Sequence, residues 1–476
     1  MINDNTIVAP ATTPGTGAIS IVRLSGPQAF EIADKVITLK SGTISAAKAY
    51  TIHYGSVFSK GSSVISSEVE KSHLLDEVLV SVFRAPHSYT GEDSVEISTH
   101  ASSYIVTELI RLLISAGARM ADPGEFTRRA FINGKMDLAQ AEAVADVIYS
   151  TTSASHRVAM NQLKGHFSNE LSRLREQLLE MASLLELELD FSEEDVEFAD
   201  RSRLLELIGK TISHVDKLAA SFKAGNMIKN GVPVAIVGPT NAGKSTLLNA
   251  LAGEDRAIVS DIAGTTRDTI EEVINIDGIL FRFIDTAGLR DSQDIVEKMG
   301  IERSYRKLSE ASIVLALPDS LAALEEICSH IDFSFQKLFI LVNKIDSLSI
   351  NDINNYVITY NNFVLNNKYQ AVILKISAKT NSGISELKSA LSNSQKDLVS
   401  NIDGVFITNE RHYNSLLQAS ASLRAARHAM ESGTPSELIA EDLRTAISSI
   451  NAILGRNLLD PDTILHSIFS RHCIGK

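Results

Sequence analysis

The sequence has few cysteines and no long apolar run. Only two cysteines, Cys328 and Cys473, occur among its 476 residues, and they lie far apart in the chain. This usage gives no disulfide framework and predicts a reducing compartment. The chain also lacks the about 18–20 consecutive apolar residues that a membrane-spanning helix needs, and no apolar segment follows its first basic residue, Arg23, as in a signal peptide. These absences predict a cytoplasmic protein.

Positive charge is also scarce. The chain has 45 basic and 58 acidic residues, a net charge of −13. A basic face for nucleic acid is therefore not built into the composition, and contact with RNA would need a local patch or a basic partner. The 44% hydrophobic and 22% charged residues are those of an ordinary globular protein, which excludes disordered and collagen-like classes. A length of 476 residues predicts two to four domains.

The first quarter of the chain alternates short β-branched runs with turn residues. Residues 18–24 and 77–83 are predicted strands. Residues 28–37 and 104–116 have the apolar spacing of helices. We therefore expect a compact α+β domain, with an exposed loop over the Ser-, Gly- and charge-rich residues 59–72.

From about residue 138 the pattern becomes helical. One stripe of apolar residues continues over six turns without a break: Leu163, Phe167, Leu171, Leu174, Leu178, Met181 and Leu185. The acidic residues that follow, within 186–200, are either a solvated helix end or a docking surface for a basic partner. After residue 400 the helical pattern returns, with a predicted buried face made of Leu438, Leu443, Ile447, Ile450 and Leu454.

Between the two helical regions, strands and helices alternate, which predicts a doubly wound, mostly parallel α/β sheet. The predicted strands are residues 232–237, 281–284, 313–317, 338–342 and 371–376. The chain is thus expected to be multidomain, with an α/β domain inserted into an all-α domain. The expected boundaries are 1–130 for the N-terminal domain, 131–229 and 391–476 for the helical domain, and 230–390 for the inserted domain.

Residues 238–245 have the sequence G-x-x-x-x-G-K-S between a predicted strand and a predicted helix. In this phosphate-binding loop (P-loop), glycines let backbone N–H groups turn toward phosphate. Lys244 reaches the terminal phosphates, and the Ser245 hydroxyl ligates magnesium. The predicted nucleotide contacts of this segment are Asn241, Ala242, Gly243, Lys244, Ser245 and Thr246.

Two switch motifs follow the P-loop in the order that a guanine-nucleotide switch needs. In residues 264–268, Thr266 can complete the magnesium shell and sense the γ-phosphate. In the motif Asp285-Thr286-Ala287-Gly288, Asp285 can hold magnesium through water and the Gly288 N–H can contact the γ-phosphate.

Two base-recognition motifs come next. Asp346, in Asn343-Lys344-Ile345-Asp346, can accept two hydrogen bonds from guanine that adenine cannot offer. The segment Ser377-Ala378-Lys379 can reach the guanine oxygen through backbone N–H groups. Each short motif is weak alone, but five in order at strand ends predict a GTPase domain.

One residue departs from Ras-type enzymes. Gly288 is followed by Leu289, where Ras-type proteins have a glutamine that orients the attacking water. Leucine cannot hydrogen-bond to water. Either the domain hydrolyses GTP slowly, or another acid and another positive charge do this work.

These residues resemble, over the whole chain, the tRNA modification GTPase MnmE (TrmE) family, whose GTPases are of the TrmE-Era-EngA-YihA-septin-like class. The segments that carry the resemblance are residues 4–9 (DNTIVA), 23–26 (RLSG), 89–93 (YTGED), 123–126 (PGEF), 137–143 (DLAQAEA), 261–268 (DIAGTTRD) and 473–476 (CIGK). In the family these mark a folate-binding N-terminal domain, a helical domain and an inserted GTPase domain.

The resemblance implies a specific activity. Members form homodimers through their N-terminal domains and work with the FAD-dependent protein MnmG in a heterotetramer. Together they install an aminomethyl or carboxymethylaminomethyl group at C5 of the wobble uridine, U34, of certain tRNAs. The one-carbon unit comes from 5-formyl- or 5,10-methylene-tetrahydrofolate, and GTP hydrolysis requires Mg²⁺ and is stimulated by K⁺.

The resemblance also assigns roles around the GTP. It implies a K⁺ ion held by Asn241, by the carbonyls of Ser260 and Ile262 and by the region of Thr265, in place of an arginine finger. The resemblance gives Glu297 the role of orienting the attacking water. Without the resemblance, Glu297 would be interpreted as a solvent-facing helix residue. The further nucleotide contacts are expected at Ser260, Asp261, Ile262, Ala263, Gly264, Thr265 and Thr266.

For folate, the resemblance implies contacts from Arg23, Glu96, Lys135 and Lys476. Glu96 can accept from a pterin amino group and ring N–H, and the basic residues can meet the folate carboxylates. Taken singly, these four residues could equally be surface charges.

The C-terminal tail is part of the implied folate site. From its chemistry alone, Cys473 would be an unreactive tail residue. The resemblance favours a functional residue, without saying which role it has. A prenylation box does not fit the terminal sequence. After His100 the family has two glycines where this chain has Ala101 and Ser102, so backbone approach to the ligand differs there.

Two other classes of GTPase compete with this interpretation. A ribosome-assembly GTPase switch shares the five GTP motifs, but usually carries a KH-type or second GTPase domain instead of this N-terminus and tail. A membrane-remodelling GTPase would need a lipid-binding surface, which the net charge of −13 does not supply.

Overall fold

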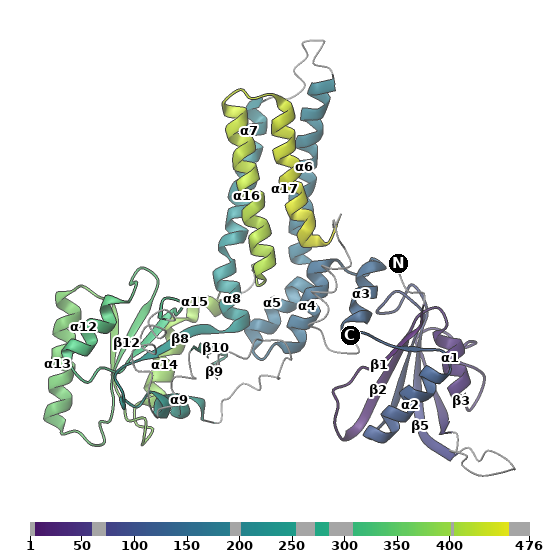
Figure 1. Cartoon of the computed structure of the whole chain (residues 1–476), viewed down its shortest axis with the longest axis horizontal. Coiled ribbons are helices and arrows are strands. Elements are labelled where there is room, and N and C mark those ends of the chain that lie inside the picture. Colours follow the sequence, from purple (N-terminus) through teal and green to yellow (C-terminus); the bar gives the residue numbers. More distant parts are fainter. Residues whose placement is uncertain are drawn as a thin grey trace, which may run out of the picture. The chain divides into compact units, whose positions relative to one another are not determined.

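The computed structural model describes residues 5–59, 73–190, 201–253, 272–284, 308–400 and 404–456. Its contacts divide the chain into two compact units (Figure 1). The first comprises residues 1–145 with 454–476, and the second comprises residues 146–453. Within the described parts of the chain, no helix is long and apolar enough to cross a membrane.

The first unit is built on a sheet of seven described strands. These are Ile7–Pro10 (β1), Gly17–Ser25 (β2), Ile37–Leu39 (β3), Thr51–Ser59 (β4), His73–Phe83 (β5), Ser94–Ala101 (β6) and Arg119–Met120 (β7). The strand order is β3-β4-β5-β6-β2-β1-β7. Within this sheet β1 and β7 pair in parallel, and the other neighbouring strands that the structure describes are antiparallel.

Helices cover one face of this sheet. The helices of the unit are Ala29–Val36 (α1), Ser103–Ser115 (α2), Glu125–Ile132 (α3) and Leu138–Tyr149 (α4), the last of which ends in the second unit. Alternate strand residues such as Val22, Val80 and Ile97 are fully buried against α1 and α2. The intervening residues form the opposite face, where Ile19 and Ile52 are 67% and 68% exposed. On that opposite face, Phe126 of α3 packs against Ile7 and Ala9 of β1, whereas the part around Ile19 and Ile52 is open. The predicted α+β domain is therefore confirmed.

Six of the helices that the structure describes form the helical part of the second unit. They are Ser153–Leu163 (α5), His166–Asp190 (α6), Arg201–Ala220 (α7), Phe222–Asn230 (α8), Glu410–Glu431 (α16) and Ser436–Leu454 (α17). The predicted stripe is buried along α6 from Phe167 to Leu185. The prediction of one unbroken helix from Leu163 onward was wrong at its start. Gly165, at a φ of 82°, separates Leu163 in α5 from α6.

One residue of the last predicted helix face is placed wrongly. Leu438 is 58% exposed, whereas Leu443, Ile447, Ile450 and Leu454 are buried as expected. Leu438 lies five residues before Leu443, which is about 140° away around a helix. Ile439 occupies the buried position instead.

The inserted part of the second unit is a sheet of six described strands with helices between them. The strands are Val232–Val237 (β8), Glu272–Ile276 (β9), Ile279–Phe283 (β10), Ile313–Ala316 (β11), Lys337–Val342 (β12) and Ala371–Lys375 (β13). The helices are Lys244–Ala252 (α9), Leu321–Ser329 (α12), Ile350–Asn366 (α13), Ile384–Ser394 (α14) and Lys396–Ser400 (α15).

The strand order of this sheet is β13-β12-β11-β8-β10-β9. All neighbours are parallel except the edge hairpin β9–β10, which the sequence did not predict. Apolar residues on both faces pack into two cores, as a parallel sheet covered on both sides requires. The loops after β8, β12 and β13 therefore meet at one end of the sheet.

Candidate nucleotide-binding site

The P-loop joins β8 to α9, and at two of its positions the backbone conformation favours glycine and leaves no room for a Cβ atom. Gly243 has a φ of 96°, and a Cβ there would lie 2.5 Å from Asn343 Nδ2. Gly238 has a φ of 156°, and a Cβ there would lie 2.6 Å from the Leu317 carbonyl oxygen. Asn241 also has a left-handed backbone, at φ 64°, which asparagine adopts more readily than most residues. The loop is thus a cradle of backbone that Cβ atoms would fill.

The charged group of the loop points into that cradle. Lys244 Nζ donates to the carbonyl oxygens of Gly238 and Pro239, at 2.7 and 3.0 Å. Burial lowers the pKa of Lys244. Ser245 and Thr246 follow in the first turn of α9, so their backbone N–H groups face the same end of the helix. This arrangement suits a phosphate, which offers Lys244 negatively charged acceptors in place of neutral carbonyls.

Asn343, directly after β12, holds three loops together. Its Nδ2 donates to the Ala242 carbonyl of the P-loop at 2.8 Å. Its Oδ1 accepts from the Ala378 N–H, after β13, at 3.1 Å. The sequence predicted all three segments as nucleotide contacts, and the structure brings them together through one amide. Lys344, the next residue, has a left-handed backbone at φ 63°.

Asp346 is also held in place by the loop after β13. Ser377 Oγ donates to Asp346 Oδ1 at 2.6 Å, and the Thr380 N–H donates to Ser377 Oγ at 3.2 Å. The hydrogen bond from Ser377 lowers the pKa of Asp346. An ionised, oriented carboxylate is the acceptor that guanine N1–H and its amino group need. Lys379 follows on the same loop and contributes a further favourable charge at Asp346.

The remaining GTP residues lie outside the described parts of the chain. These are Ser260, Asp261, Ile262, Ala263, Gly264, Thr265, Thr266, Asp285, Thr286, Ala287, Gly288 and Glu297. Leu289 lies outside them as well, as do Cys473 and Lys476 of the tail. The magnesium and potassium ligands predicted on the described part are therefore Ser245 and Asn241.

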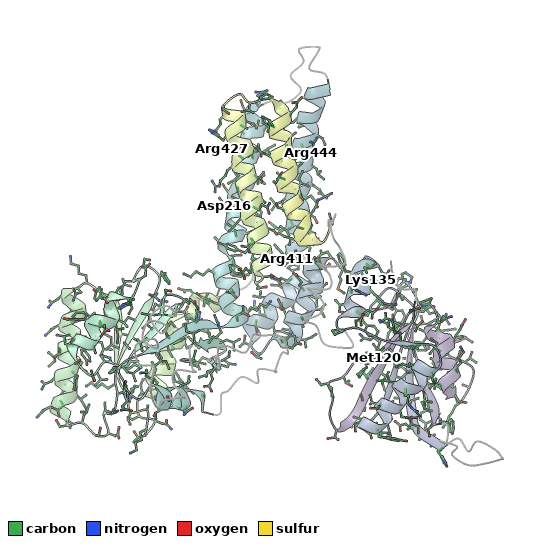
Figure 2. The ribbon with its side chains drawn as sticks, in the orientation of Figure 1. Met120, Lys135, Asp216, Arg411, Arg427 and Arg444 are labelled. Carbon is green, nitrogen blue, oxygen red and sulfur yellow. The ribbon has the colours of Figure 1, made fainter. Side chains whose placement is uncertain are left out.

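In the first unit, two predicted folate residues lie side by side on the face of the sheet away from α1 and α2, where their side chains are 15% and 25% exposed. Arg23 on β2 and Glu96 on β6 are register partners, and the Arg23 guanidinium lies 2.9 Å from Glu96 Oε1. The Arg23 guanidinium also lies 5.2 and 5.6 Å from the ring centroids of Tyr89 and Phe126. Lys135 is separate from this pair, and its Nζ donates to the Pro86 carbonyl at 2.9 Å (labelled in Figure 2).

Sequence reasoning missed a buried charge network beside Arg23. Glu125, at the start of α3, is 2% exposed and accepts from Arg119 at 2.6 Å and from Arg129 at 3.1 Å. Arg129 also reaches Glu92, at 3.1 Å. Burial alone would raise the pKa of Glu125, but the hydrogen bonds from Arg119 and the Asp122 N–H and the two arginine charges lower it. The spacing of Glu125 and Arg129, four residues apart in a predicted helix, was the available signal.

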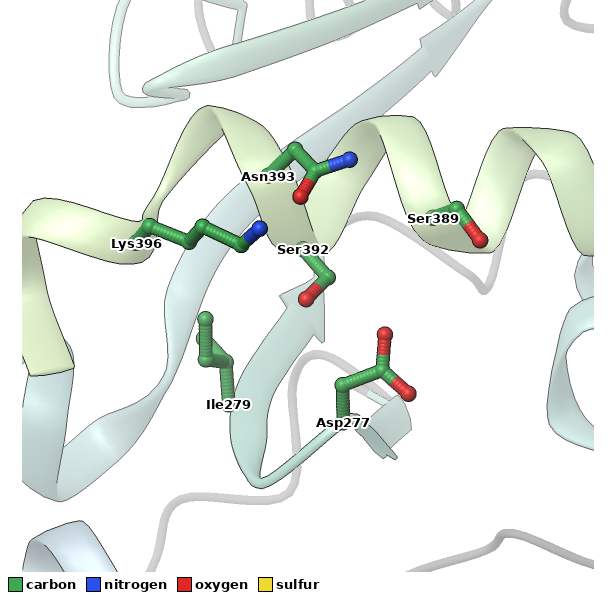
Figure 3. A pocket seen from close by; sticks show the side chains of 6 residues that line it. All are labelled: Asp277, Ile279, Ser389, Ser392, Asn393 and Lys396. Carbon is green, nitrogen blue, oxygen red and sulfur yellow. The ribbon is translucent and has the colours of Figure 1, made fainter.

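A cavity of about 350 Å³ in the second unit lies apart from the nucleotide loops (Figure 3). Its lining residues are Asp277, Ile279, Ser389, Ser392, Asn393 and Lys396. Ile279 begins β10, and Phe281 of that strand is level with Val232, where β8 begins. The cavity is thus at the opposite end of the sheet from the P-loop, which follows the end of β8. It is not part of the nucleotide site.

A P-loop follows a parallel strand and opens a helix, Asn343 bridges it to Ala378, and Ser377 of that same loop donates to Asp346. This arrangement is that of a GTP-binding protein of the P-loop class. Two family models match the chain. The GTP-binding protein TrmE N-terminus matches residues 6–135, and the MnmE helical domain matches residues 138–473. The chain belongs to the MnmE (TrmE) family of tRNA modification GTPases.

Individual relatives agree over the full length. The tRNA modification GTPase MnmE of Flavobacterium johnsoniae is 47% identical over 485 residues, covering 100% of both chains. That of Cytophaga hutchinsonii is 47% identical over 99% of this chain and 98% of its own, and that of Bacteroides fragilis is 45% identical over 100% of both. A solved structure of Era with MgGDPNP and 16S ribosomal RNA nucleotides is 20% identical over 51% of this chain and 98% of its own, with a TM-score of 0.27.

Proposed function

We propose that this GTPase works with the FAD-dependent protein MnmG to build the 5-carboxymethylaminomethyl or aminomethyl group on U34 of certain tRNAs. A tetrahydrofolate derivative supplies the one-carbon unit, and the reaction takes place in the cytoplasm. The observation that carries the proposal is the agreement with tRNA modification GTPases over the whole chain, N-terminal domain included. A ribosome-assembly GTPase gives no reason for such an N-terminal domain.

The domain boundaries belong to the same proposal. Residues 1–130 are the folate-binding and dimerisation domain, 131–229 and 391–476 are the helical domain, and 230–390 are the GTPase domain. The open part of the sheet face away from α1 and α2 supports dimerisation in the first of these, because Ile19, Ile52 and Leu79 expose apolar surface there that a second copy would cover.

At the GTPase site, we propose that Ser245 and Thr266 hold Mg²⁺, and that Asn241, Ser260, Ile262 and Thr265 hold K⁺. The left-handed backbone of Asn241 in the P-loop supports the K⁺ assignment, because asparagine adopts that conformation more readily than most residues and brings a side-chain oxygen to the loop. Bound there, these ions supply positive charge to the phosphates. Glu297 orients the attacking water, a role that Leu289 cannot fill. Equal GTP turnover in Na⁺ and K⁺ at matched ionic strength would contradict the K⁺ assignment.

In the N-terminal domain, we propose that Arg23, Glu96, Lys135 and Lys476 bind the folate, with Cys473 nearby. The pairing of Arg23 with Glu96 supports a site on the sheet face away from α1 and α2, because an acceptor and a donor stand together beside the Tyr89 ring. A pterin presents the complementary donors and acceptors. Ala101 ends the strand that carries Glu96, and Ser102 follows it as the N-cap of α2.

Mass spectrometry of tRNA from a deletion strain tests the function directly. We expect U34 to be unmodified while ribosome profiles stay normal, and the modification to return when the gene is restored. A strain that keeps its modified U34 but accumulates ribosomal precursors would instead identify a ribosome-assembly GTPase.

A further inference from the structure

Four helices of the second unit, α6, α7, α16 and α17, form two pairs of opposite charge. Helices α7 and α16 pack against each other, and α6 meets α17 where Arg175 Nε donates to Asn451 Oδ1 at 2.8 Å. Counting Lys, Arg, Asp and Glu, α7 and α16 together carry seven basic and four acidic residues, a net charge of +3. Helices α6 and α17 carry three basic and nine acidic residues, a net charge of −6. The α7–α16 pair is thus a local basic patch in an acidic chain.

The exposed side of α7 presents this charge as a row. Arg203, Lys210 and Lys217 are exposed and recur every seven residues, so they lie on one side of the helix about 10 Å apart. Glu206 pairs with Lys210, Nζ to Oε1, at 2.6 Å, but both side chains are about two-thirds exposed. Such a surface pair contributes little free energy. Lys210 can therefore turn to another anion at small cost.

Helix α16 extends the row sideways. Arg424 of α16 pairs with Asp216 of α7, and Ser420 Oγ donates to the same carboxylate at 2.6 Å. Because Asp216 precedes Lys217, this contact places Arg424 beside the row. Arg427 lies one turn further along α16, where Figure 2 labels it, and pairs with Glu431 at 2.8 Å. The basic residues of the two helices therefore form one face, which we call the α7–α16 face.

We propose that the α7–α16 face binds the sugar–phosphate backbone of tRNA. The inference rests on the proposed action on U34. Lysine and arginine side chains supply most of the affinity for a nucleic-acid backbone and carry no base preference. The row fits backbone binding without base recognition. Helix α7 supplies flexible cations for phosphates and has no Phe, Tyr or Trp on which bases could stack. The acidic α6–α17 pair repels the same backbone, so the bundle accepts tRNA on one side only.

The test compares two double variants of the full-length chain. Lys210→Gln with Lys217→Gln removes two charges from the α7–α16 face. Arg173→Gln with Arg444→Gln removes two from exposed positions of α6 and α17, the second of which Figure 2 labels. Filter binding of an unmodified tRNA transcript is measured across a range of KCl concentrations, and GTP hydrolysis without tRNA is measured beside it.

The lysine variant is expected to bind tRNA about tenfold or more weakly near physiological salt. Its slope of log affinity against log salt should fall by about two, one for each lost phosphate contact. The arginine control should bind like the unaltered chain, and GTP hydrolysis without tRNA should be unchanged in both.

Equal losses in the two variants, or no loss in the lysine variant, would overturn the proposal. If the lysine variant bound tRNA normally but MnmG less tightly, the face would be a protein-docking surface. The deletion strain separates these failures from failure of the proposed function. If U34 loses its modification there while the lysine variant binds tRNA normally, only the α7–α16 face is wrong.

Discussion

The two sheets of the chain present their candidate site residues in different ways. In the parallel sheet, they stand in loops at the ends of adjacent strands, and Asn343 ties two of those loops to the P-loop. In the antiparallel sheet, Arg23 and Glu96 stand within strands, on the face away from α1 and α2, and pair with each other. In the first arrangement, the backbone conformation of the loops determines which ligand fits. In the second, Arg23 and Glu96 already neutralise each other without a ligand, so ligand-binding measurements decide the role of the pair.

The largest effect that we expect from a single substitution is on base recognition. Asp346→Asn removes the carboxylate that accepts from guanine and replaces one oxygen by a donor. GTP affinity should fall by about 10²–10⁴-fold, and xanthosine triphosphate should bind in its place. Competition binding with the two nucleotides measures both changes.

Asp352→Asn is the matched control, because Asp352 is exposed on α13 and accepts from the Ser349 hydroxyl at the start of the same helix. It should leave GTP affinity unchanged. An Asp346→Asn protein that still preferred GTP would show that guanine is recognised elsewhere.

The second prediction concerns the stability of the first unit. Glu125→Gln removes the carboxylate shared by the buried Arg129, which keeps its pairing with Glu92, and by Arg119, whose side chain is 32% exposed. The loss of these charge-assisted hydrogen bonds costs about 1.5–3 kcal/mol. The lowered pKa of Glu125 means that its contribution is present above the unfolded-state value near 4.5 and is lost as the pH falls through the folded-state value. Chemical denaturation at pH 7 and pH 4 should therefore give a large difference from the unaltered chain at pH 7 and a smaller one at pH 4.

Glu31→Gln is the control for that loss, because Glu31 is exposed on α1. It should change the free energy of unfolding by little at either pH. A Glu125→Gln protein as stable as the unaltered chain at pH 7 would mean that the buried network contributes nothing net.

The limits of sequence prediction follow the same division. Val232–Val237 was predicted to the residue, because a buried parallel strand is a continuous apolar run with a glycine loop after it. The bridge made by Asn343 was not, because it joins segments 101 and 35 residues apart. Leu438 was misplaced for a related reason, since spacing along one helix does not say which stripe meets a neighbour.

The third prediction asks whether the Arg23–Glu96 pair is a ligand site. Glu96→Ala should weaken binding of 5-formyl-tetrahydrofolate by about tenfold or more in calorimetry, because the pterin loses a charged acceptor. Glu77→Ala is the matched control, since Glu77 is exposed on the neighbouring strand β5. Folate binding unchanged in Glu96→Ala would place the pocket elsewhere and leave the pair a structural contact.

The smallest expected effect separates the geometry of Asp346 from its charge. Ser377→Ala removes the hydroxyl that donates to Asp346 at 2.6 Å and lowers its pKa. GDP affinity should fall only a few-fold at pH 7, because the carboxylate stays ionised there. The lowered pKa keeps Asp346 ionised as the pH falls. Without the Ser377 hydroxyl, the pKa of Asp346 rises, so the decline of GDP affinity at acid pH (the acid limb) should begin at a higher pH. Fluorescence titration of a labelled GDP from pH 7 to pH 4 measures that shift.

Ser382→Ala serves as the control for this last change, because Ser382 contacts Ser377 through its backbone carbonyl, which accepts from the Ser377 N–H at 2.9 Å. The substitution keeps that bond, so both the affinity and the acid limb should match those of the unaltered chain. If Ser377→Ala weakened GDP equally at every pH, its hydroxyl would orient Asp346 without affecting its ionisation. If it changed neither quantity, the base site would be held by the backbone loops and Asn343 alone, and the contrast with the side-chain pair of the antiparallel sheet would be sharper still.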